Sequence, residues 1–135
     1  MSGDRPSRPE CPTRRELGRE AEALAERYLA GLGYQTLARN HATRRGEVDL
    51  VCREGQVIAF VEVRSRSSAA QGSPLETVGP VKARRVVAAA TDWAQRNGAL
   101  GAALRFDVVA VLLDGPEPRF ELVRGAFDAS GRACP

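Results

Sequence analysis

The chain has 135 residues, 43% of them hydrophobic and 27% charged, which is the composition of one globular domain with a single core. These values exclude a collagen, a coiled coil and an intrinsically disordered chain. The formal net charge of +3 allows a polyanionic partner without requiring one. No apolar run approaches the roughly 20 residues of a membrane span, and the N-terminus lacks the apolar core of a secretory signal, so we expect a cytoplasmic protein with no membrane partner.

The three cysteines, Cys11, Cys52 and Cys134, lack the spacing of metal ligands, and their number is odd. They imply neither a disulfide framework nor a zinc site. We interpret them as reduced thiols, with Cys52 in the core.

The N-terminal third of the chain predicts one helix and one strand. Residues 1–14 carry prolines among charges and show no periodicity, which indicates a flexible leader. Apolar residues then recur at helical spacing and predict a helix over about 15–32, which Gly31 and Gly33 would end. Residues 34–39 are typical of a short strand.

The middle of the chain predicts a β-hairpin and a second helix. Alternation and β-branched residues on both sides of a glycine turn indicate paired strands over residues 47–53 and 57–64. Residues 65–74, rich in Ser, Ala and Gly, predict a loop. The second helix is expected to begin at Pro80 and to continue to Asn97, just before a glycine stop.

The C-terminal third predicts strands over residues 104–113 and 120–123, followed by a flexible tail over 129–135. The order is therefore helix, three strands, helix, strand, strand. The chain has no internal repeat and no linker long enough to divide it, so we expect one α/β domain over residues 15–128.

The hairpin can be aligned residue by residue if its turn is Gly55-Gln56, because a type II′ turn prefers glycine at its first central position. Counting back from that turn places Asp49 directly opposite Glu62. A three-residue turn would instead put these two carboxylates on opposite faces. With the two-residue turn, the other face is apolar and expected to be buried, and consists of Val48, Leu50, Cys52, Ala59, Val61 and Val63.

Two carboxylates across a sheet, with Cβ atoms about 5 Å apart, repel each other, so a cation should lie beside them. Mg²⁺ takes oxygen ligands and is commonly held by one or two carboxylates together with a substrate phosphate. Asp49 and Glu62 are therefore a candidate metal pair, with the Val63 carbonyl as a third ligand. The alternative is two solvated residues paired with Arg64 or with other arginines. Their position between apolar neighbours in the centre of both strands argues against that alternative.

Glu22 lies at the edge of the apolar stripe of the first helix, at about 100° per residue. From there it could reach over the sheet and join Asp49 and Glu62. Taken by itself, Glu22 is typical of a plain surface glutamate.

Several motifs occur in a fixed order: Gly18 four residues before Glu22, Arg39-Asn40, GEVDLV at 46–51, FVEVRSR at 60–66 and RFDVV at 105–109. Together they resemble the YraN family of bacterial predicted endonucleases over roughly residues 15–128. The combination of GEVDLV and FVEVRSR at this spacing is highly specific.

This resemblance implies a restriction-endonuclease-like fold, related to archaeal Holliday-junction resolvases, in which helices flank a central mixed sheet in the order αβββαββ. The signature of that fold is an Asp on one strand and Glu-x-Lys on the next. It implies Asp49 and Glu62 as ligands of Mg²⁺ or Mn²⁺, and Glu22 as the helical acidic residue that completes the site. Arg64 stands where the signature has lysine. Lys82 resembles the family's basic residue that opens the second helix, and would lie near the scissile phosphate.

The arginine at position 64 limits the chemistry available there. A guanidinium stays protonated at any working pH, so it donates hydrogen bonds and charge but cannot accept a proton. Arg64 would therefore clamp the phosphate or the transition state, and metal coordination would lower the pKa of the attacking water.

Basic residues before and after the hairpin and at the start of the second helix could form a surface that follows phosphates around the carboxylates. Few exposed aromatic residues are available for base stacking, which favours recognition of backbone or shape. Each basic residue alone could be an ordinary solvated charge. The candidates are Arg44, Arg45, Arg66, Lys82 and Arg85.

Four other residues receive a structural interpretation. A single histidine, His41, excludes a multi-histidine zinc or HNH nuclease site. We interpret Asp92 and Asp107 as structural or capping residues, and Trp93 as part of the core.

The sequence thus predicts a small metal-dependent endonuclease that hydrolyses DNA phosphodiester bonds, with branched or otherwise structured DNA as a candidate substrate. Cutting both strands of a symmetric junction would be easiest for a two-fold homodimer. The alternative is a non-catalytic DNA-binding or interaction module that keeps the fold, and Arg64 is its main support. A structural domain that binds no nucleic acid rests only on the modest net charge.

Overall fold

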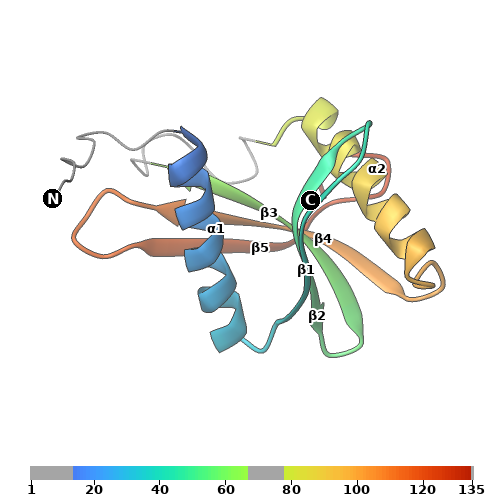
Figure 1. Ribbon diagram of the computed structural model, residues 1–135, viewed down its shortest axis with the longest axis horizontal. Coiled ribbons are helices and arrows are strands. Elements are labelled where there is room, and N and C mark those ends of the chain that lie inside the picture. Colours follow the sequence, from blue (N-terminus) through green and yellow to red (C-terminus); the bar gives the residue numbers. More distant parts are fainter. Residues whose placement is uncertain (1–13, 67–77, 135) are drawn as a thin grey trace, which may run out of the picture.

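The computed structural model describes residues 14–66 and 78–134, in which two helices and five strands follow the predicted order (Figure 1). The elements are α1 (Arg14–Gly31), β1 (Gln35–Ala42), β2 (Glu47–Glu54), β3 (Val57–Arg66), α2 (Pro80–Arg96), β4 (Ala103–Leu112) and β5 (Arg119–Phe127). Only β5 differs much in length from its predicted counterpart. It continues past Val123 because Gly125, at a φ of +64°, lies in an irregularity of its pairing with β4.

The strands form one sheet in the order β1-β2-β3-β4-β5. β3 and β4 are parallel, and all other neighbours are antiparallel. A parallel pair requires a crossover connection, and the segment that contains α2 provides it. The protein is therefore a single α/β domain with a mixed sheet, in agreement with the restriction-endonuclease-like order αβββαββ.

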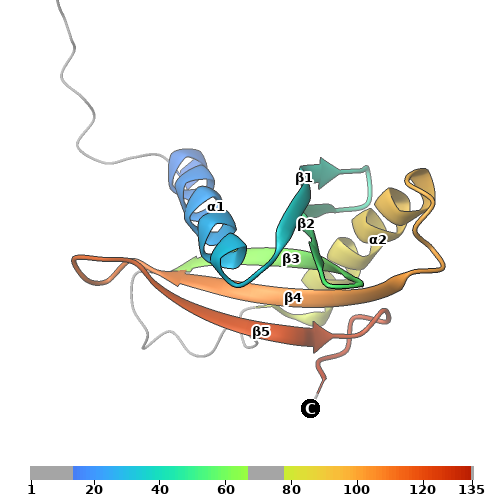
Figure 2. The ribbon, with the colours of Figure 1, turned by 90° about the horizontal axis from the view of Figure 1, so that it is seen from below.

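Apolar side chains cover both faces of the central strands, and β3 is buried along most of its length for this reason. One cluster packs α1 against residues such as Leu50 and Val61, and the other packs α2 against Val51 and Phe60. Figures 1 and 2 show the β1–β2 hairpin standing between the two helices. Neither α1 nor α2, the helices of the described chain, is long and apolar enough to cross a membrane.

Two predicted core residues are found where they were expected. Cys52 is completely buried in the α1-side cluster. Trp93 packs at the border of the α2-side cluster, with its ring edge-on to Phe60 at a centroid distance of 5.9 Å.

Residues 129–134, predicted as a flexible tail, are instead tied to the end of β5. The Asp128 carboxylate accepts hydrogen bonds from the backbone N–H groups of Ser130 and Arg132, both at 3.0 Å. The Cys134 N–H donates to the Ala126 carbonyl at 3.0 Å. An aspartate that bonds its own following backbone makes a turn, and this turn returns the chain to the sheet. Leader residues 1–13 and loop residues 67–74 lie outside the described residues, as does residue 135.

The turn between β1 and β2 is held by its own polar groups and by α2. Thr43 Oγ1 accepts hydrogen bonds from the backbone N–H groups of Arg45 at 3.1 Å and Gly46 at 3.2 Å. Gly46 lies directly on the α2 backbone, where a Cβ atom would overlap the Arg85 carbonyl. Glycine at this position therefore sets how closely the hairpin approaches α2.

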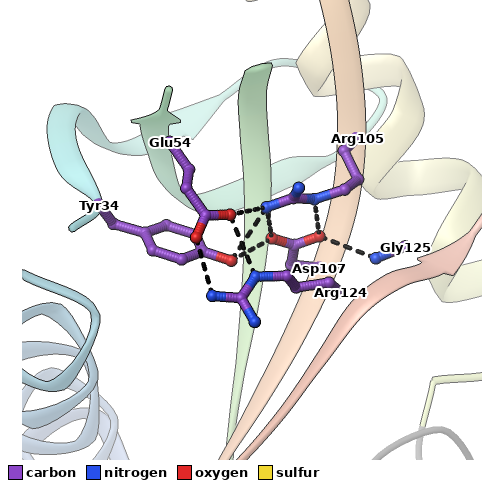
Figure 3. A network of polar contacts seen from close by, with 6 residues as sticks. All are labelled: Tyr34, Glu54, Arg105, Asp107, Arg124 and Gly125. Atoms are coloured by element: carbon purple, nitrogen blue, oxygen red, sulfur yellow. Dashed lines mark hydrogen bonds and ion pairs between the residues drawn. The ribbon is translucent and has the colours of Figure 1, made fainter. Parts of the chain in front are cut away.

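A buried polar network joins Tyr34, just before β1, to residues of β2, β4 and β5 (Figure 3). Asp107 is completely buried, and its carboxylate accepts hydrogen bonds from the Tyr34 hydroxyl at 2.7 Å and the Gly125 backbone N–H at 2.9 Å. The Arg105 guanidinium donates to both Asp107 oxygens and to Glu54. These contacts agree with the structural interpretation of Asp107.

We expect Gly46→Ala to lower the free energy of unfolding by about 3 kcal/mol, because the added methyl group meets a helix backbone that cannot rotate away. Gly18→Ala is the control, since no atom lies near its Cβ position inside α1, and it should stabilise the protein by roughly 0.5–1 kcal/mol. Urea denaturation measures both effects. A Gly46→Ala protein as stable as the parent would show that the turn does not dock on α2.

Candidate metal and nucleic-acid site

The β2–β3 hairpin has the predicted two-residue turn. Strand pairing runs from Glu54–Val57 back to Leu50–Val61, in the register obtained by counting. Gly55 has a φ of +61°, whereas Gln56 is not in the positive region, which identifies the turn as type II′. The register is thus confirmed as far as Leu50–Val61, the pair next to Asp49 and Glu62.

β2 departs from regular pairing at Asp49. Its pairing with β3 ends at Leu50. On its other side, the β1 residue at the same level is Asn40, which has a left-handed φ of +51° in the middle of a strand. Both irregularities occur at the same level of the sheet, and they allow the Asp49 side chain to turn toward β3.

The break also corrects one prediction. Strict alternation puts Val48 on the same face as Leu50 and Cys52, but Val48 packs in the α2-side cluster while the other two lie in the α1-side cluster. The strand rotates at Asp49, so alternation does not carry through it.

The Asp49 and Glu62 carboxyl groups meet, and positively charged side chains surround Glu62. Asp49 Oδ2 accepts a hydrogen bond of 2.8 Å from the Val63 backbone N–H, where regular pairing would place a strand–strand bond. Glu62 is only 2% exposed. Its Oε2 lies 3.3 Å from Lys82 Nζ at the start of α2 and 3.5 Å from Arg64 Nη1.

Burial makes the charged form of both carboxyl groups unfavourable. Burial and then the neighbouring Asp49 charge raise the pKa of Glu62 to about 8, against the opposing charges of Lys82 and Arg64. Burial also raises the pKa of Asp49, although the Val63 N–H partly offsets it. Each shift means that a proton or a further cation would stabilise the pair.

Glu22 reaches this pair from α1. It is half-buried beside Ala21 and Ala25, whose small side chains let the helix approach the sheet closely. Burial and then the Asp49 charge raise the pKa of Glu22 to about 7. The structure therefore brings Glu22 to Asp49, whose carboxyl group in turn meets that of Glu62, although the three residues lie on different elements.

Two further residues of this cluster were not among the sequence candidates. Asn40 donates a hydrogen bond to Glu22, which lowers the pKa of that glutamate, and the nearby Glu47 charge raises it. Asparagine is one of the few non-glycine residues that readily adopt left-handed backbone, so an asparagine inside a strand was a detectable signal. Its contact with Glu22 depends on how α1 packs, which no local pattern reveals.

The donor set fits a hard divalent ion. Asp49 and Glu62 offer carboxylate oxygens, and the Val63 carbonyl points to the same side of its strand as the N–H that binds Asp49. With Glu22 and Glu47, the carboxyl groups outnumber the two cations on Glu62. Among the described residues no three acidic, histidine or cysteine side chains form a ready metal cluster, so phosphate and water would complete the coordination, as is common for Mg²⁺.

The predicted phosphate-binding residues occupy different environments. Lys82 lies at the carboxylate pair. Arg44 and Arg45 form the exposed tip of the β1–β2 turn, and Arg85 is exposed on the part of α2 that supports this turn. Arg66 differs from these, because it is 5% exposed at the end of β3.

The raised pKa of Glu62 predicts that stability depends on pH. A carboxyl group whose pKa is higher in the folded state contributes stability at acid pH, which is lost as the pH rises from 4.5 through about 8. We therefore expect the free energy of unfolding of the metal-free protein to fall over this range. Glu62→Gln, which cannot titrate, should lose less, by on the order of 2 kcal/mol.

Chemical denaturation at several pH values measures this difference. Glu121→Gln is the control, since it removes an exposed glutamate of β5. The prediction fails if all three proteins lose stability equally with rising pH.

Comparison with known proteins matches this chain to one family. Residues 21–111 match the model of "Uncharacterised protein family UPF0102". The chain is 65% identical over 123 residues to a UPF0102 protein of Anaeromyxobacter sp. (strain Fw109-5), covering 91% of this chain and 92% of that one. It is 45% identical over 115 residues to a UPF0102 protein of Chromohalobacter salexigens, covering 85% and 93%.

A third relative is the UPF0102 protein GSU0650 of Geobacter sulfurreducens, 42% identical over 113 residues, with 83% of this chain and 88% of that one covered. The matched residues 21–111 include Glu22, Asp49, Glu62 and Lys82. By its family match and by these relatives, the chain belongs to the uncharacterised protein family UPF0102, the YraN family that its motifs indicated.

Proposed function

We propose that this protein is a metal-dependent endonuclease that hydrolyses DNA phosphodiester bonds. One observation carries the proposal: the Asp49 carboxyl group meets that of the buried Glu62, and burial raises the pKa of both although Lys82 and Arg64 lie nearby. A divalent ion that a phosphate also coordinates would supply further positive charge.

Each residue of the cluster has a role in this proposal. Asp49 and Glu62 would hold Mg²⁺ or Mn²⁺, with the Val63 carbonyl as third ligand and Glu22 as support from α1. When bound, such an ion polarises the phosphate and lowers the pKa of a coordinated water molecule. Arg64 keeps its proton, so it would clamp the phosphate or stabilise transition-state charge.

The basic residues around the cluster would hold the DNA. Lys82 would lie closest to the scissile phosphate, while Arg44, Arg45 and Arg85 would contact the backbone farther away. Arg66 is buried and would not be part of this surface. Branched DNA is a candidate substrate, and a two-fold homodimer would place one site on each of two strands.

A non-catalytic DNA-binding module is the second candidate, and one observation favours it. Arg64 and Lys82 both contact Glu62, so two cations of the protein already neutralise part of the charge that the ion would balance. Arginine at position 64 also provides no proton acceptor.

Cleavage of labelled DNA decides between the two candidates. Linear, flapped and four-way-junction DNA would be incubated with Mg²⁺, Mn²⁺ or EDTA. We expect cutting with the ions and none in EDTA, and a loss of roughly 100-fold or more for Asp49→Asn and for Glu62→Gln. Glu121→Gln should cut normally. DNA binding without cutting under every condition would contradict the endonuclease and support the module.

A separate prediction concerns Lys82. Its charge lowers the pKa of Glu62 and also opposes a divalent ion there, so Lys82→Met should raise that pKa and tighten ion binding, while the lost contact with the scissile phosphate slows cleavage by roughly 10- to 100-fold. Cleavage rates and calorimetric Mn²⁺ binding, both followed against pH, would measure this. Arg84→Met removes an exposed charge from the same helix and serves as the control. Unchanged rate and affinity in Lys82→Met would remove this residue from the site.

A further inference from the structure

A groove of about 690 Å³ lies between the β1–β2 turn and the C-terminal half of α2. It is separate from the carboxylate pair, whose residues do not line it. One wall consists of residues 41–45. The other consists of polar and small residues of α2, namely Ala88, Thr91, Asp92, Gln95 and Arg96.

The groove carries unbalanced positive charge. Among the described residues that line it, Asp92 is the only acidic one, and it is already engaged, because its Oδ2 lies 2.9 Å from Arg96 Nε and 2.8 Å from His41 Nε2. Arg44 and Arg45 also line the groove, and neither has an ion-pair partner among the described residues. Three arginines thus face one aspartate, which favours an anionic ligand.

Contacts within the protein hold the backbone of both walls. The Thr43 hydroxyl holds the turn that carries Arg44 and Arg45, and Gly46 seats this turn against the α2 backbone. The opposite wall is a regular helix. A preformed site binds with little ordering cost.

The position of the groove relates it to the carboxylate pair through α2. Lys82, beside Glu62, and Asp92, in the groove, are ten residues apart on this helix, which corresponds to about 15 Å along its axis. Successive phosphates of one strand rise by about 3.4 Å along the axis of a DNA duplex, so for a duplex that runs along α2 this separation spans roughly four nucleotides.

The lining also indicates which part of a nucleic acid fits. The described part of the chain lines the groove with no tryptophan, tyrosine or phenylalanine, so these residues offer no platform for base stacking. Guanidinium groups with threonine and glutamine side chains are typical contacts for phosphates.

We infer that this groove binds the phosphodiester backbone of duplex DNA, about four nucleotides from the bond that is cut. The location of the cut rests on the proposed function. Binding in the groove does not require cleavage, so it can be tested separately.

The test adds a negative charge to the groove without removing any basic residue. Gln95→Glu is nearly isosteric and exposed on α2, and Gln56→Glu makes the same change at the exposed β2–β3 turn. Binding of a fluorescent DNA duplex in EDTA would be measured by anisotropy. We expect Gln95→Glu to weaken binding roughly five-fold or more at low salt, and Gln56→Glu to have little effect. Equal weakening by both would overturn the inference.

A second measurement uses the salt dependence of binding. Replacing Arg44 and Arg45 together by alanine should reduce the slope of log affinity against log salt concentration by about two. Replacing Arg27 and Arg53, two exposed arginines without ion-pair partners in the described chain, removes the same charge elsewhere. An equal change in both double variants would mean that net charge, and not the groove, determines binding.

The cleavage assay separates failure of this inference from failure of the proposed function. If the parent protein cuts DNA and Gln95→Glu binds DNA like the parent, the inference about the groove is wrong and the proposed endonuclease function stands. If Gln95→Glu weakens DNA binding but no ion condition gives cutting, the inference about the groove is supported and the proposed endonuclease function is wrong.

Discussion

A carboxylate removed from water needs a proton or a positive charge nearby, and Glu62 is removed from water with a second carboxylate against it. It lies within β3, which pairs with β4 along its whole length, so it cannot turn out to solvent without breaking the sheet. Lys82 and Arg64 meet this requirement in part. The raised pKa values of the cluster show that the requirement is not fully met, and this shortfall is what makes a divalent cation chemically suitable.

The sheet is irregular at the level of this pair. Regular pairing would give the Val63 N–H a backbone partner on β2, but the Asp49 carboxylate takes that place. Asn40 adopts left-handed backbone at the same level and bonds Glu22 from there. Strained backbone and interrupted pairing cost free energy, and such features gather at sites that bind or react. Here they bring three strands and α1 to one point.

Asp107 and the Asp49–Glu62 pair are both acidic and largely removed from water, but their surroundings suit them to different roles. Asp107 is as buried as Glu62, but a hydroxyl, a backbone N–H and a guanidinium hydrogen-bond directly to its carboxylate (Figure 3). Its bonds are saturated, and it ties strands together. In the Asp49–Glu62 pair each carboxyl group has the other against it, and burial raises the pKa of both despite Lys82, Arg64 and the Val63 N–H. A satisfied network stabilises a fold, whereas an unsatisfied one can bind something more.

The sequence by itself determined the order of elements, both helices and the β2–β3 register, because helical periodicity, Pro80 and the Gly55-Gln56 turn are local signals. Counting from that turn predicted Asp49 opposite Glu62, and the observed pairing follows this register as far as Leu50–Val61. Only the tertiary structure decided that β2 rotates at Asp49, that Asn40 bonds Glu22, that Arg66 is buried and that the β1–β2 turn and α2 enclose a basic groove. These features depend on how the helices pack on the sheet, which brings together residues tens of positions apart in the sequence. The alternation of residues along one strand does not predict such contacts.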